Sequence, residues 1–425
     1  MVATNFIKIF SITVLVAFLT SSVESATDCP PSIKSATTSN EKKQKYIVMF
    51  KKGDKSAADN HFQMLKDCYN ARVEHVSEQS SFSATSEKIL DFSVDGLQGY
   101  SGLLPPSMAE QIKKMQSIAL VEADAKVKIQ YAIPQNFTRR AVDNKPTKND
   151  DRIDQAKRPL DGKYTFPDSA GKGVNIFVVD TGIRTTHSEF NGRAKFGKSF
   201  CDGCNDQDEN GHGTHVSSIA AGKTLGVARN ANLIAVRVLD KTGSGSNSAV
   251  INGLSFVLQQ HNNGKNKNSV VNMSLGGASS QAVNSAVKDL TDAGVHVAVA
   301  AGNDGEDACK SSPASEPSAV TVGATEEDSE QITDFSNIGT CVDIFAPGRN
   351  IQGAGIKNDN DGAVFSGTSQ ATPHVAGTLA LMIAKDGNKS PADLAKDLND
   401  LSTKGVVEGI GNTKSPDSFL RIPSP

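Results

Sequence analysis

The segment 174–179 restricts the fold of this 425-residue chain more than any other, because five of its six residues are apolar. A strand that is apolar on both faces is typical of a parallel sheet covered by helices on both sides. Further strand-like segments follow at 233–239, 270–274, 295–300, 319–322 and 342–345, with helix-like stretches at 249–259 and 281–293. Because strands that alternate with helices form βαβ units, we predict an α/β fold with a doubly wound, mostly parallel sheet.

A smaller unit precedes this fold, between about residues 45 and 131. Strand-like stretches at 46–50, 89–94, 99–104 and 118–129 alternate there with helix-like stretches at 59–68 and 107–115. This pattern predicts a small α+β domain. The polar residues 26–44 ahead of it are typical of a loose leader.

The polar segment 132–159 contains several prolines and the dibasic pair Arg139 and Arg140, which is typical of a linker open to proteolysis. We therefore assign 26–131 to a leader region that includes the small domain. Residues 132–159 form a processing linker and the start of the mature protein, and 160–425 form the main domain.

The first 25 residues have the features of a secretory signal peptide. Lys8 supplies a positive charge, residues 9–19 form an apolar core, and small polar residues allow cleavage after Ser25. The apolar run covers about 11 residues, whereas a membrane-spanning helix needs about 20. We therefore expect no stable membrane anchor. Six cysteines fit an oxidising compartment, so we predict a secreted, extracellular protein.

The stretch 366–377 carries a serine in a setting that suits a nucleophile. Ser369 is expected at the start of an apolar helix, where free N–H groups and the helix dipole favour a developing oxyanion. Gly367 leaves room for a substrate carbonyl, and Pro373 is tolerated in the first helical turn. A serine at this place is most often only an N-cap, so the interpretation depends on two further stretches.

Asp180 and His212 stand in those two stretches. Asp180 follows the strand at 174–179, at the end of a parallel sheet where ligands gather, although alone it would be interpreted as an Asx turn. His212 lies between two glycines at the head of a helix and can act as a base near neutral pH. His215 could join it on zinc, but the HExxH pattern and a carboxylate at metal spacing are absent. We interpret His215 as a packed core histidine.

Asn303 follows another strand and could donate its side-chain amide to an oxyanion. The chain order Asp180, His212, Ser369 is the order found in subtilisin. Residues 180–182, 212–215 and 367–369 match three signature motifs. Over nearly all of 160–425, the chain therefore resembles the subtilisin-like serine proteases, and in detail their proteinase K-like branch.

The resemblance implies a role for each of these residues. Ser369 would attack the peptide carbonyl, His212 would take and return the proton, and Asp180 would hold the imidazole. Asn303 and the backbone N–H of Ser369 would form the oxyanion hole. The segments implied to bind substrate are Gly243, Ser244 and Gly245; Ser274, Leu275 and Gly276; and Ala300, Ala301 and Gly302. The small residues of the last segment suggest broad specificity with apolar or aromatic side chains before the cut.

Residues 45–131 are similar to the inhibitory propeptide of that family. The resemblance implies an endopeptidase made as a self-processed zymogen, whose propeptide assists folding and blocks the cleft. We expect the cut between Tyr131 and Asn144. The expected partners are protein and peptide substrates and the propeptide itself, and we expect a monomer. Nucleic acid is not an expected partner, because the net charge is -3 and the basic residues form no stripe.

A structural calcium ion is a further implication of the resemblance. The carbonyls of Pro317 and Ala319 and the carboxylate of Asp343 would bind it, which is an oxygen-only set that suits calcium. The alternative is that Asp343 only caps a strand end. No catalytic cofactor is implied.

The cysteines form three groups along the chain. Cys309 and Cys341 match positions that are bridged in some relatives. Cys201 and Cys204 form a CxxC pair that lacks the context of a metal or redox site, so we favour a local disulfide. Cys29 and Cys68 remain for the leader.

Gln370 departs from the family pattern, which usually has methionine after the nucleophile. Because glutamine lacks an oxidisable thioether, we expect activity to resist peroxide. Two other functions compete with a peptidase. A catalytically inactive scaffold is disfavoured by the intact candidate residues. An esterase of the α/β-hydrolase type would place serine first in the chain, within Gly-x-Ser-x-Gly.

Overall fold

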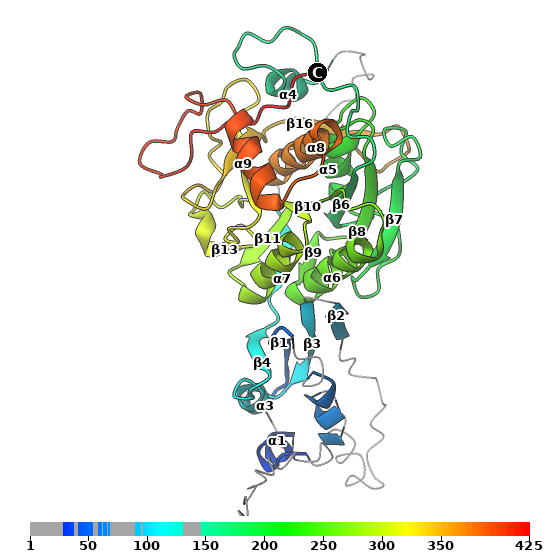
Figure 1. Ribbon diagram of the computed structural model, residues 1–425, viewed down its shortest axis with the longest axis vertical. Helices are drawn as coiled ribbons and strands as arrows, with labels where there is room; N and C mark the ends of the chain where they lie inside the picture. The colour runs from blue at the N-terminus through cyan, green and yellow to red at the C-terminus, as the bar shows by residue number, and fades with distance from the viewer. Residues whose placement is uncertain are drawn as a thin grey trace, which may run out of the picture.

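The structure is a computed structural model that describes residues 29–37, 41–53, 58–61, 63–65, 67–68, 90–94, 97–130 and 146–425. The predicted signal peptide, the dibasic pair at 139–140 and the expected cut between residues 131 and 144 lie outside these residues. The described residues form a large domain and a smaller N-terminal domain below it (Figure 1). None of the helices in this part of the chain is both long and apolar enough to cross a bilayer.

A seven-stranded sheet lies at the centre of the large domain, with the order β15-β14-β12-β10-β6-β8-β7. Every neighbouring pair in it is parallel. The strands are β6 Asn175–Asp180, β7 Ala194–Ser199, β8 Asn232–Arg237, β10 Ser269–Met273, β12 His296–Ala300, β14 Val320–Thr325 and β15 Ile344–Pro347. The predicted doubly wound α/β fold is confirmed, since the strands that follow β6 in the chain lie on both sides of it.

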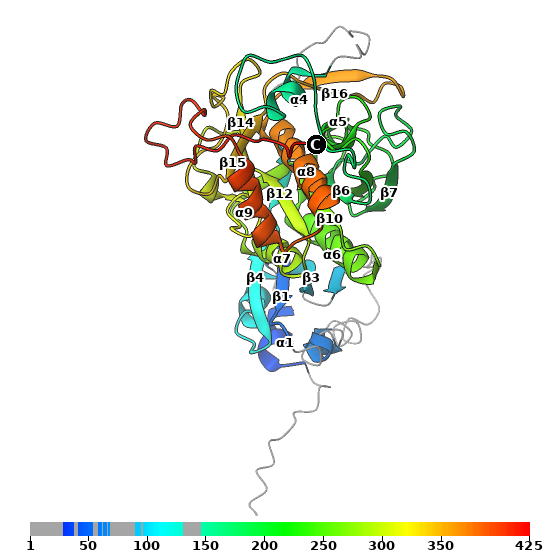
Figure 2. The same ribbon diagram turned by 45° about the horizontal axis from the view of Figure 1, so that its top comes forward.

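Helices cover both faces of this sheet. The helices are α5 His212–Ala221, α6 Asn247–Asn263, α7 Gln281–Asp292, α8 Thr368–Asp386 and α9 Pro391–Leu401. Ile176 and Val178 of β6 belong to the core shared with α5 and α8, whereas Phe177 and Val179 belong to the core shared with α6 and α7. Figure 2 shows α8 and α9 lying across one face of the sheet. Because both faces of β6 are covered in this way, residues 176–179 are all apolar.

The remaining elements of the large domain lie at its edges. They are α4 Lys148–Ile153, β9 Ser244–Ser246, β11 Leu275–Ala278, the 3-10 helix η1 Ala308–Lys310, β13 Ser311–Ser312, β16 Ile351–Ala354 and β17 Gly362–Phe365. The end of the chain lies beside α4, where the N–H of Ile422 donates to the carbonyl of Ile153 at 2.8 Å. The three disulfides of the structure join Cys29 to Cys68, Cys201 to Cys204 and Cys309 to Cys341.

The small domain has an antiparallel sheet with the order β2-β3-β1-β4. Its elements are α1 Pro31–Thr37, β1 Gln44–Phe50, β2 Leu90–Val94, β3 Leu97–Leu104, α3 Pro106–Ile112 and β4 Ile118–Ala123, with further helical residues between 58 and 68. The expectation of a loose leader at 26–44 is therefore wrong for α1. Ile33 and Ala36 of α1 are buried in the core of the domain, and the Cys29–Cys68 disulfide holds the helix there.

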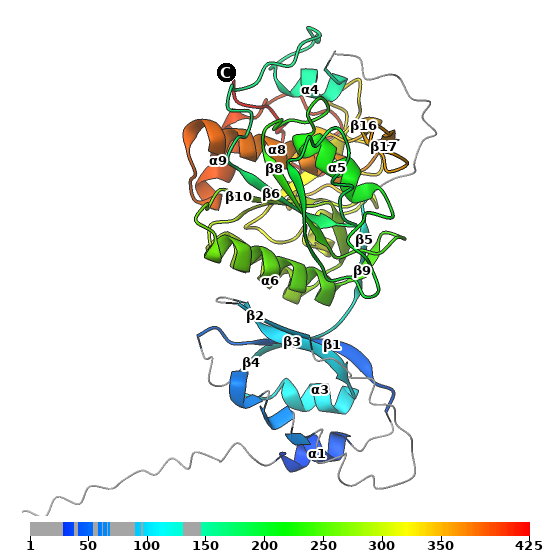
Figure 3. The same cartoon turned by 90° about the vertical axis from the view of Figure 1, so that its right-hand side faces the viewer.

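The small domain lies beside α6 and α7 (Figure 1), and the open face of its sheet faces α6 in Figure 3. Ile47, Met49 and Leu97 pack there in one apolar cluster with residues of both helices. Two carboxylates complete the contact. Glu122 accepts from the N–H of Gln281 at 2.9 Å at the start of α7. Asp124 accepts from the N–H of Ser248 at 2.9 Å in the first turn of α6.

The strand expected at 118–129 is two strands. β4 ends at Ala123, and β5 Lys126–Ile129 leaves the small domain and joins the large one. Asp124 lies at the break, where its N–H still donates to the carbonyl of Lys45 in β1 and its carboxylate accepts from the N–H and the hydroxyl of Ser248 in α6. The chain thus enters the large domain beside two of the predicted substrate-binding segments, 243–245 and 274–276.

Candidate active site

Asp180 and His212 form a buried hydrogen-bonded pair. Asp180 is the last residue of β6 and His212 the first of α5, and Nδ1 of His212 lies 2.8 and 3.0 Å from the two carboxylate oxygens. The N–H of Thr181 also donates to Oδ1 of Asp180, at 2.7 Å. Because the carboxylate can only accept, Nδ1 of His212 carries the proton. In the neutral ring Nε2 is therefore the nitrogen that can take one up.

Asp208 fixes the relative position of these two residues, and the sequence analysis missed it. Its carboxylate accepts from the N–H groups of Gly211 and Thr214 at 2.8 and 2.9 Å, which are free donors at the start of α5. It also accepts from Oγ1 of Thr181 at 2.9 Å. An aspartate a few residues before the start of a helix is a capping signal, and this signal could have identified Asp208.

Ser369 lies in the first turn of α8 and is fully buried. Its hydroxyl donates to the carbonyl of Ser274 at 2.9 Å, and the hydroxyl of Ser274 donates back to the carbonyl of Ser369 at 2.9 Å. The reciprocal bonds hold the start of α8 against the residue between β10 and β11. Since the hydroxyl has a single proton, Ser369 must turn that proton away from Ser274 before it can give it to a base.

Asn303 is oriented by Thr368, the residue before Ser369. Its Oδ1 accepts from the N–H and the hydroxyl of Thr368 at 2.9 and 2.8 Å. The Nδ2 of the same amide is buried and has no acceptor among the described residues. The structure therefore holds a fixed N–H donor beside the start of α8, of the kind that stabilises an oxyanion.

The carbonyl of Gln130, just after β5, lies at the start of α8. The N–H of Ser369 donates to this oxygen at 3.1 Å. A Cβ atom built on Gly367 would lie 2.5 Å from the Gln130 oxygen and 2.9 Å from Nδ2 of Asn303. Glycine is thus required at 367, because any side chain would collide with the Gln130 carbonyl and with Nδ2 of Asn303.

The predicted substrate-binding segments pair with the chain's own strand β5. β5 lies between β11 and β9 in a four-stranded antiparallel sheet with the order β13-β11-β5-β9. The N–H of Ile129 donates to the carbonyl of Gly243 at 2.9 Å, and the N–H of Gln130 approaches the carbonyl of Ser274 at 3.4 Å. Backbone pairing of this kind binds an extended peptide with little demand on its sequence.

Alternate side chains of β5 face the large domain. Val127 and Ile129 are buried in its apolar core, whereas Lys126 and Lys128 are exposed. A Cβ on Gly243 would lie 2.6 Å from Cδ1 of Ile129, so this glycine makes room for the side chain.

Ala300, Ala301 and Gly302 line a cavity of about 210 Å³ at the end of β5. Residues 276–278, Ser311 and Ala314 also line the cavity. The side chain of Gln130 lines it too and is only 6% exposed. The sequence analysis suggested that residues 300–302 form a pocket wall but did not predict that Gln130 lies beside them.

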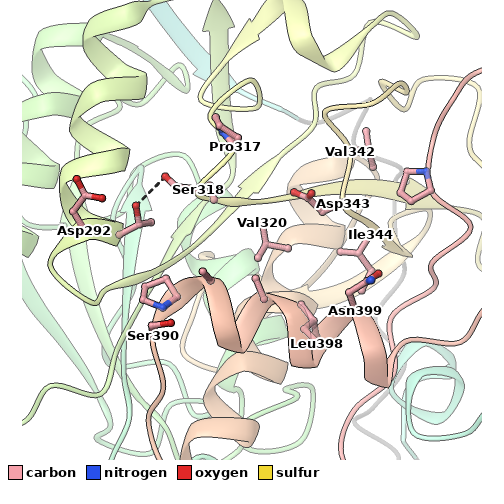
Figure 4. Close-up of a pocket in the computed structure, with 16 residues that line it drawn as sticks. Asp292, Pro317, Ser318, Val320, Val342, Asp343, Ile344, Ser390, Leu398 and Asn399 are labelled. Atoms are coloured by element: carbon pink, nitrogen blue, oxygen red, sulfur yellow. Dashed lines mark hydrogen bonds between the residues drawn. The ribbon is translucent and has the colours of Figure 1, made fainter.

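The three residues suggested for calcium line a second cavity, of about 660 Å³, with Asp343 on its wall (Figure 4). Asp343 is exposed to this cavity, yet the protein atoms around its carboxyl raise its pKa to about 6. One carboxylate oxygen accepts from the N–H of Thr321 at 2.8 Å. A nearby cation would stabilise the charged form of a carboxyl group whose pKa is raised in this way. Together with the carbonyls of Pro317 and Ala319, Asp343 offers an oxygen-only donor set of the kind that calcium binds.

Two other histidines near the site are structural. His215 is fully buried, and its ring stacks on Phe365 with the ring centroids 4.4 Å apart. Burial lowers the pKa of His215 to about 3 and that of His374 to about 4. Both rings therefore stay neutral at ordinary pH, and the interpretation of His215 as a core histidine is confirmed.

Comparison with known proteins agrees with this geometry. Residues 171–413 match the model of the subtilase family, and residues 45–130 match that of the peptidase inhibitor I9 family. Subtilisin-like protease 2 of Pseudogymnoascus destructans is 40% identical over 366 residues, which cover 85% of this chain and 86% of that protein. Subtilisin-like serine protease Pen ch 18 of Penicillium rubens is 36% identical over 432 residues, which cover 96% and 86%.

A solved structure is also similar. The crystal structure of a cold-adapted subtilisin-like serine proteinase is 42% identical, with a TM-score of 0.62, and the match covers 66% of this chain and 99% of that one. The fold and site thus define a serine peptidase with an inhibitory N-terminal domain. The chain belongs to the subtilase family and is a subtilisin-like serine protease with an I9 propeptide domain.

Proposed function

We propose that this protein is a secreted endopeptidase that cleaves peptide bonds through an acyl-enzyme on Ser369. The observation that carries the proposal is the hydrogen bond from the N–H of Ser369 to the carbonyl of Gln130, within a peptide strand bound between β9 and β11. A peptide carbonyl that accepts from the N–H of Ser369 at the start of a helix is in the position of a substrate carbonyl.

The roles of the side chains follow from their contacts. Ser369 attacks the carbonyl carbon and Nε2 of His212 accepts its proton, while Asp180 keeps the proton on Nδ1 and stabilises the imidazolium. The oxyanion that forms is bound by the N–H of Ser369 and Nδ2 of Asn303. His212 then gives its proton to the departing amine, and water releases the acid by the reverse sequence of steps.

The same geometry supports self-processing of a zymogen at the bond between Gln130 and Tyr131. This bond lies one residue before the window predicted from the sequence. After cleavage, β5 would remain paired in the cleft and the small domain would remain docked on α6 and α7, so the propeptide would act as an inhibitor until it is removed.

Three further properties belong to the proposal. Backbone pairing and the buried positions of Val127 and Ile129 support broad specificity with apolar residues at those two places. A structural calcium ion would bind to Pro317, Ala319 and Asp343 and tie the segment before β14 to the start of β15. The signal-like first 25 residues and the disulfides support secretion, and we propose a monomer without a stable membrane anchor.

The test is expression of the full precursor as wild type and as Ser369→Ala, with Ser424→Ala, an exposed serine at the chain end, as the control. Wild type and control should yield a mature protein that begins at Tyr131 and hydrolyses peptides until a serine-directed inhibitor is added. The Ser369→Ala protein should stay uncut. Hydrolysis by Ser369→Ala would refute the mechanism, peptide binding without hydrolysis by wild type would favour the scaffold, and hydrolysis of esters alone would favour the esterase.

A further inference from the structure

We infer that the pocket for the residue before the cut selects a long side chain that ends in an N–H donor, such as glutamine, lysine or arginine. The sequence predicted an apolar or aromatic residue there. The inference rests on the proposed function, since it names the side chain that the same site accepts.

The side chain of Gln130 is the first observation, because it lines this pocket and is buried. Its Nε2 donates to the carbonyl of Gly276 at 3.2 Å and lies 3.5 Å from the carbonyl of Lys128. Lys128 belongs to the bound strand itself, whereas Gly276 belongs to the large domain and offers a backbone acceptor to the end of the side chain. An apolar side chain of equal length would fill the same space but would not donate to the Gly276 carbonyl.

The charge around the mouth of the pocket is the second observation. Asp304, Glu306 and Asp307 line the cavity together with one basic residue of the large domain, Lys310. Lys310 lies 3.6 Å from Glu306, which leaves two carboxylates without a cation of their own among the residues that line the pocket. The mouth therefore attracts a positively charged side chain and repels a carboxylate. Both effects are moderate, because all four residues are exposed to solvent.

The two observations together predict an order of substrates. Glutamine and glutamate have the same shape, but glutamate offers no donor and carries the charge that the mouth repels. Methionine has similar length without a donor. We expect kcat/KM for glutamine and lysine to exceed that for methionine by about three- to tenfold. The value for glutamate should be lower than that for glutamine by about tenfold or more.

The test uses the mature enzyme and peptides that copy residues 126–135, with Gln, Lys, Met, Phe or Glu at position 130. Mass spectrometry identifies the bond cut, and kcat/KM is measured for cleavage after position 130. Faster cleavage after Gln and Lys than after Met and Phe, with Glu slowest, supports the inference. Faster cleavage after Met or Phe overturns it, and the endopeptidase proposal then still stands. If no peptide is cut at any bond, the proposed function itself is wrong.

A second measurement separates the mouth from the rest of the pocket. The double variant Asp304→Asn with Asp307→Asn removes the two carboxylates that have no ion pair with a lining residue, and it should lower the ratio of lysine to glutamate cleavage by about threefold or more. Asp400→Asn is the matched control, because it removes an exposed carboxylate on α9 that does not line the pocket. An unchanged ratio in the double variant would refute the electrostatic part of the inference.

Discussion

The backbone N–H of Ser369 donates to the carbonyl oxygen of Gln130 across 3.1 Å, so the propeptide presents a carbonyl to the start of α8. Gly367 permits this approach, and Asn303 holds the neighbouring donor in place through two bonds to Thr368. The site is thus already shaped around a reacting carbonyl in the precursor, which makes the contribution of each donor testable.

Asn303→Asp should remove the N–H donor of residue 303 and keep the oxygen that binds Thr368. Aspartate keeps the oxygen that accepts from Thr368 but replaces the buried N–H donor with a second oxygen. We expect kcat to fall by about 100- to 1000-fold with little change in KM, which is the range for loss of one such donor in subtilisin. Steady-state kinetics measure this, and an unchanged melting temperature shows that the fold is retained. Nearly normal kcat would exclude Asn303 from the oxyanion hole.

Gln370→Met should make the enzyme sensitive to peroxide. Gln370 is fully buried beside Ser369 and lacks a thioether, so wild-type activity should survive treatment that oxidises methionine. The variant should lose activity at a rate that follows formation of the sulfoxide, as measured by mass spectrometry. Rapid loss of wild-type activity, traced to a residue near Ser369, would contradict this prediction.

The same substitution should raise stability. Neither amide atom of Gln370 has a hydrogen-bond partner among the described residues, and an unsatisfied buried polar group costs about 1–3 kcal/mol. Methionine has similar length and no such need. We expect a higher midpoint in denaturant for Gln370→Met in the inhibited mature enzyme. A lower midpoint would mean that the amide finds partners in solution.

The sequence predicted the parts of this molecule that depend on short stretches. The strand that ends at Asp180 and the helices that begin at His212 and Thr368 are recognisable from apolar patterns and motifs. Because the carboxyl ends of parallel strands share one edge of the sheet, those motifs could be expected to converge. The edge strand β7 was missed, since its Lys195 and Phe196 face solvent and give no buried pattern.

Features that depend on contacts between distant residues could not be predicted in this way. The sequence around Asp208 is that of an ordinary loop, and its role follows only from its hydrogen bonds to Thr181 and to the start of α5. The break between β4 and β5 exists because Asp124 meets the start of α6, 124 residues later in the chain. α1 is polar in sequence, and only the core of the small domain and the Cys29–Cys68 disulfide explain its order.

Glu122→Gln and Asp124→Asn should loosen the propeptide. Each carboxylate accepts from N–H groups in the first turn of a helix, where a negative charge is favourable. We expect each change to raise the inhibition constant of the propeptide by about tenfold. The precursor should therefore become active sooner after self-processing. Glu110→Gln, on the exposed side of α3, is the control and should leave the lag unchanged. Equal lags in all variants would show that these caps do not contribute to docking.

Removal of calcium should lower the stability of the mature enzyme. We expect a chelator to reduce the melting temperature of the inhibited wild type by several degrees, because a bound ion stabilises only the folded state. Asp343→Asn weakens the proposed site, so its melting temperature should respond little to chelator or to added calcium. A large response that persists in Asp343→Asn would indicate that the ion binds elsewhere.

His61 should make the propeptide sensitive to acid. Its ring is buried in the small domain, where Nε2 lies 3.0 Å from the hydroxyl of Tyr100 and the ring meets the edge of Phe50. Burial lowers the pKa of His61 to about 4 from 6.5. Between these values the unfolded domain binds more protons than the folded one, so the free energy of unfolding falls as pH drops from about 6.5 to about 4. The loss from this residue can reach about 3 kcal/mol.

The consequence is faster release of the cleaved propeptide at pH 5 than at pH 7.5, measured as the lag before the precursor preparation becomes active. His61→Gln replaces the ring with a side chain that does not titrate and should reduce the difference between the two lags. Glu110→Gln again serves as the control for a change at the surface of the same domain. If His61→Gln keeps the full pH dependence while its propeptide still inhibits, another group controls release.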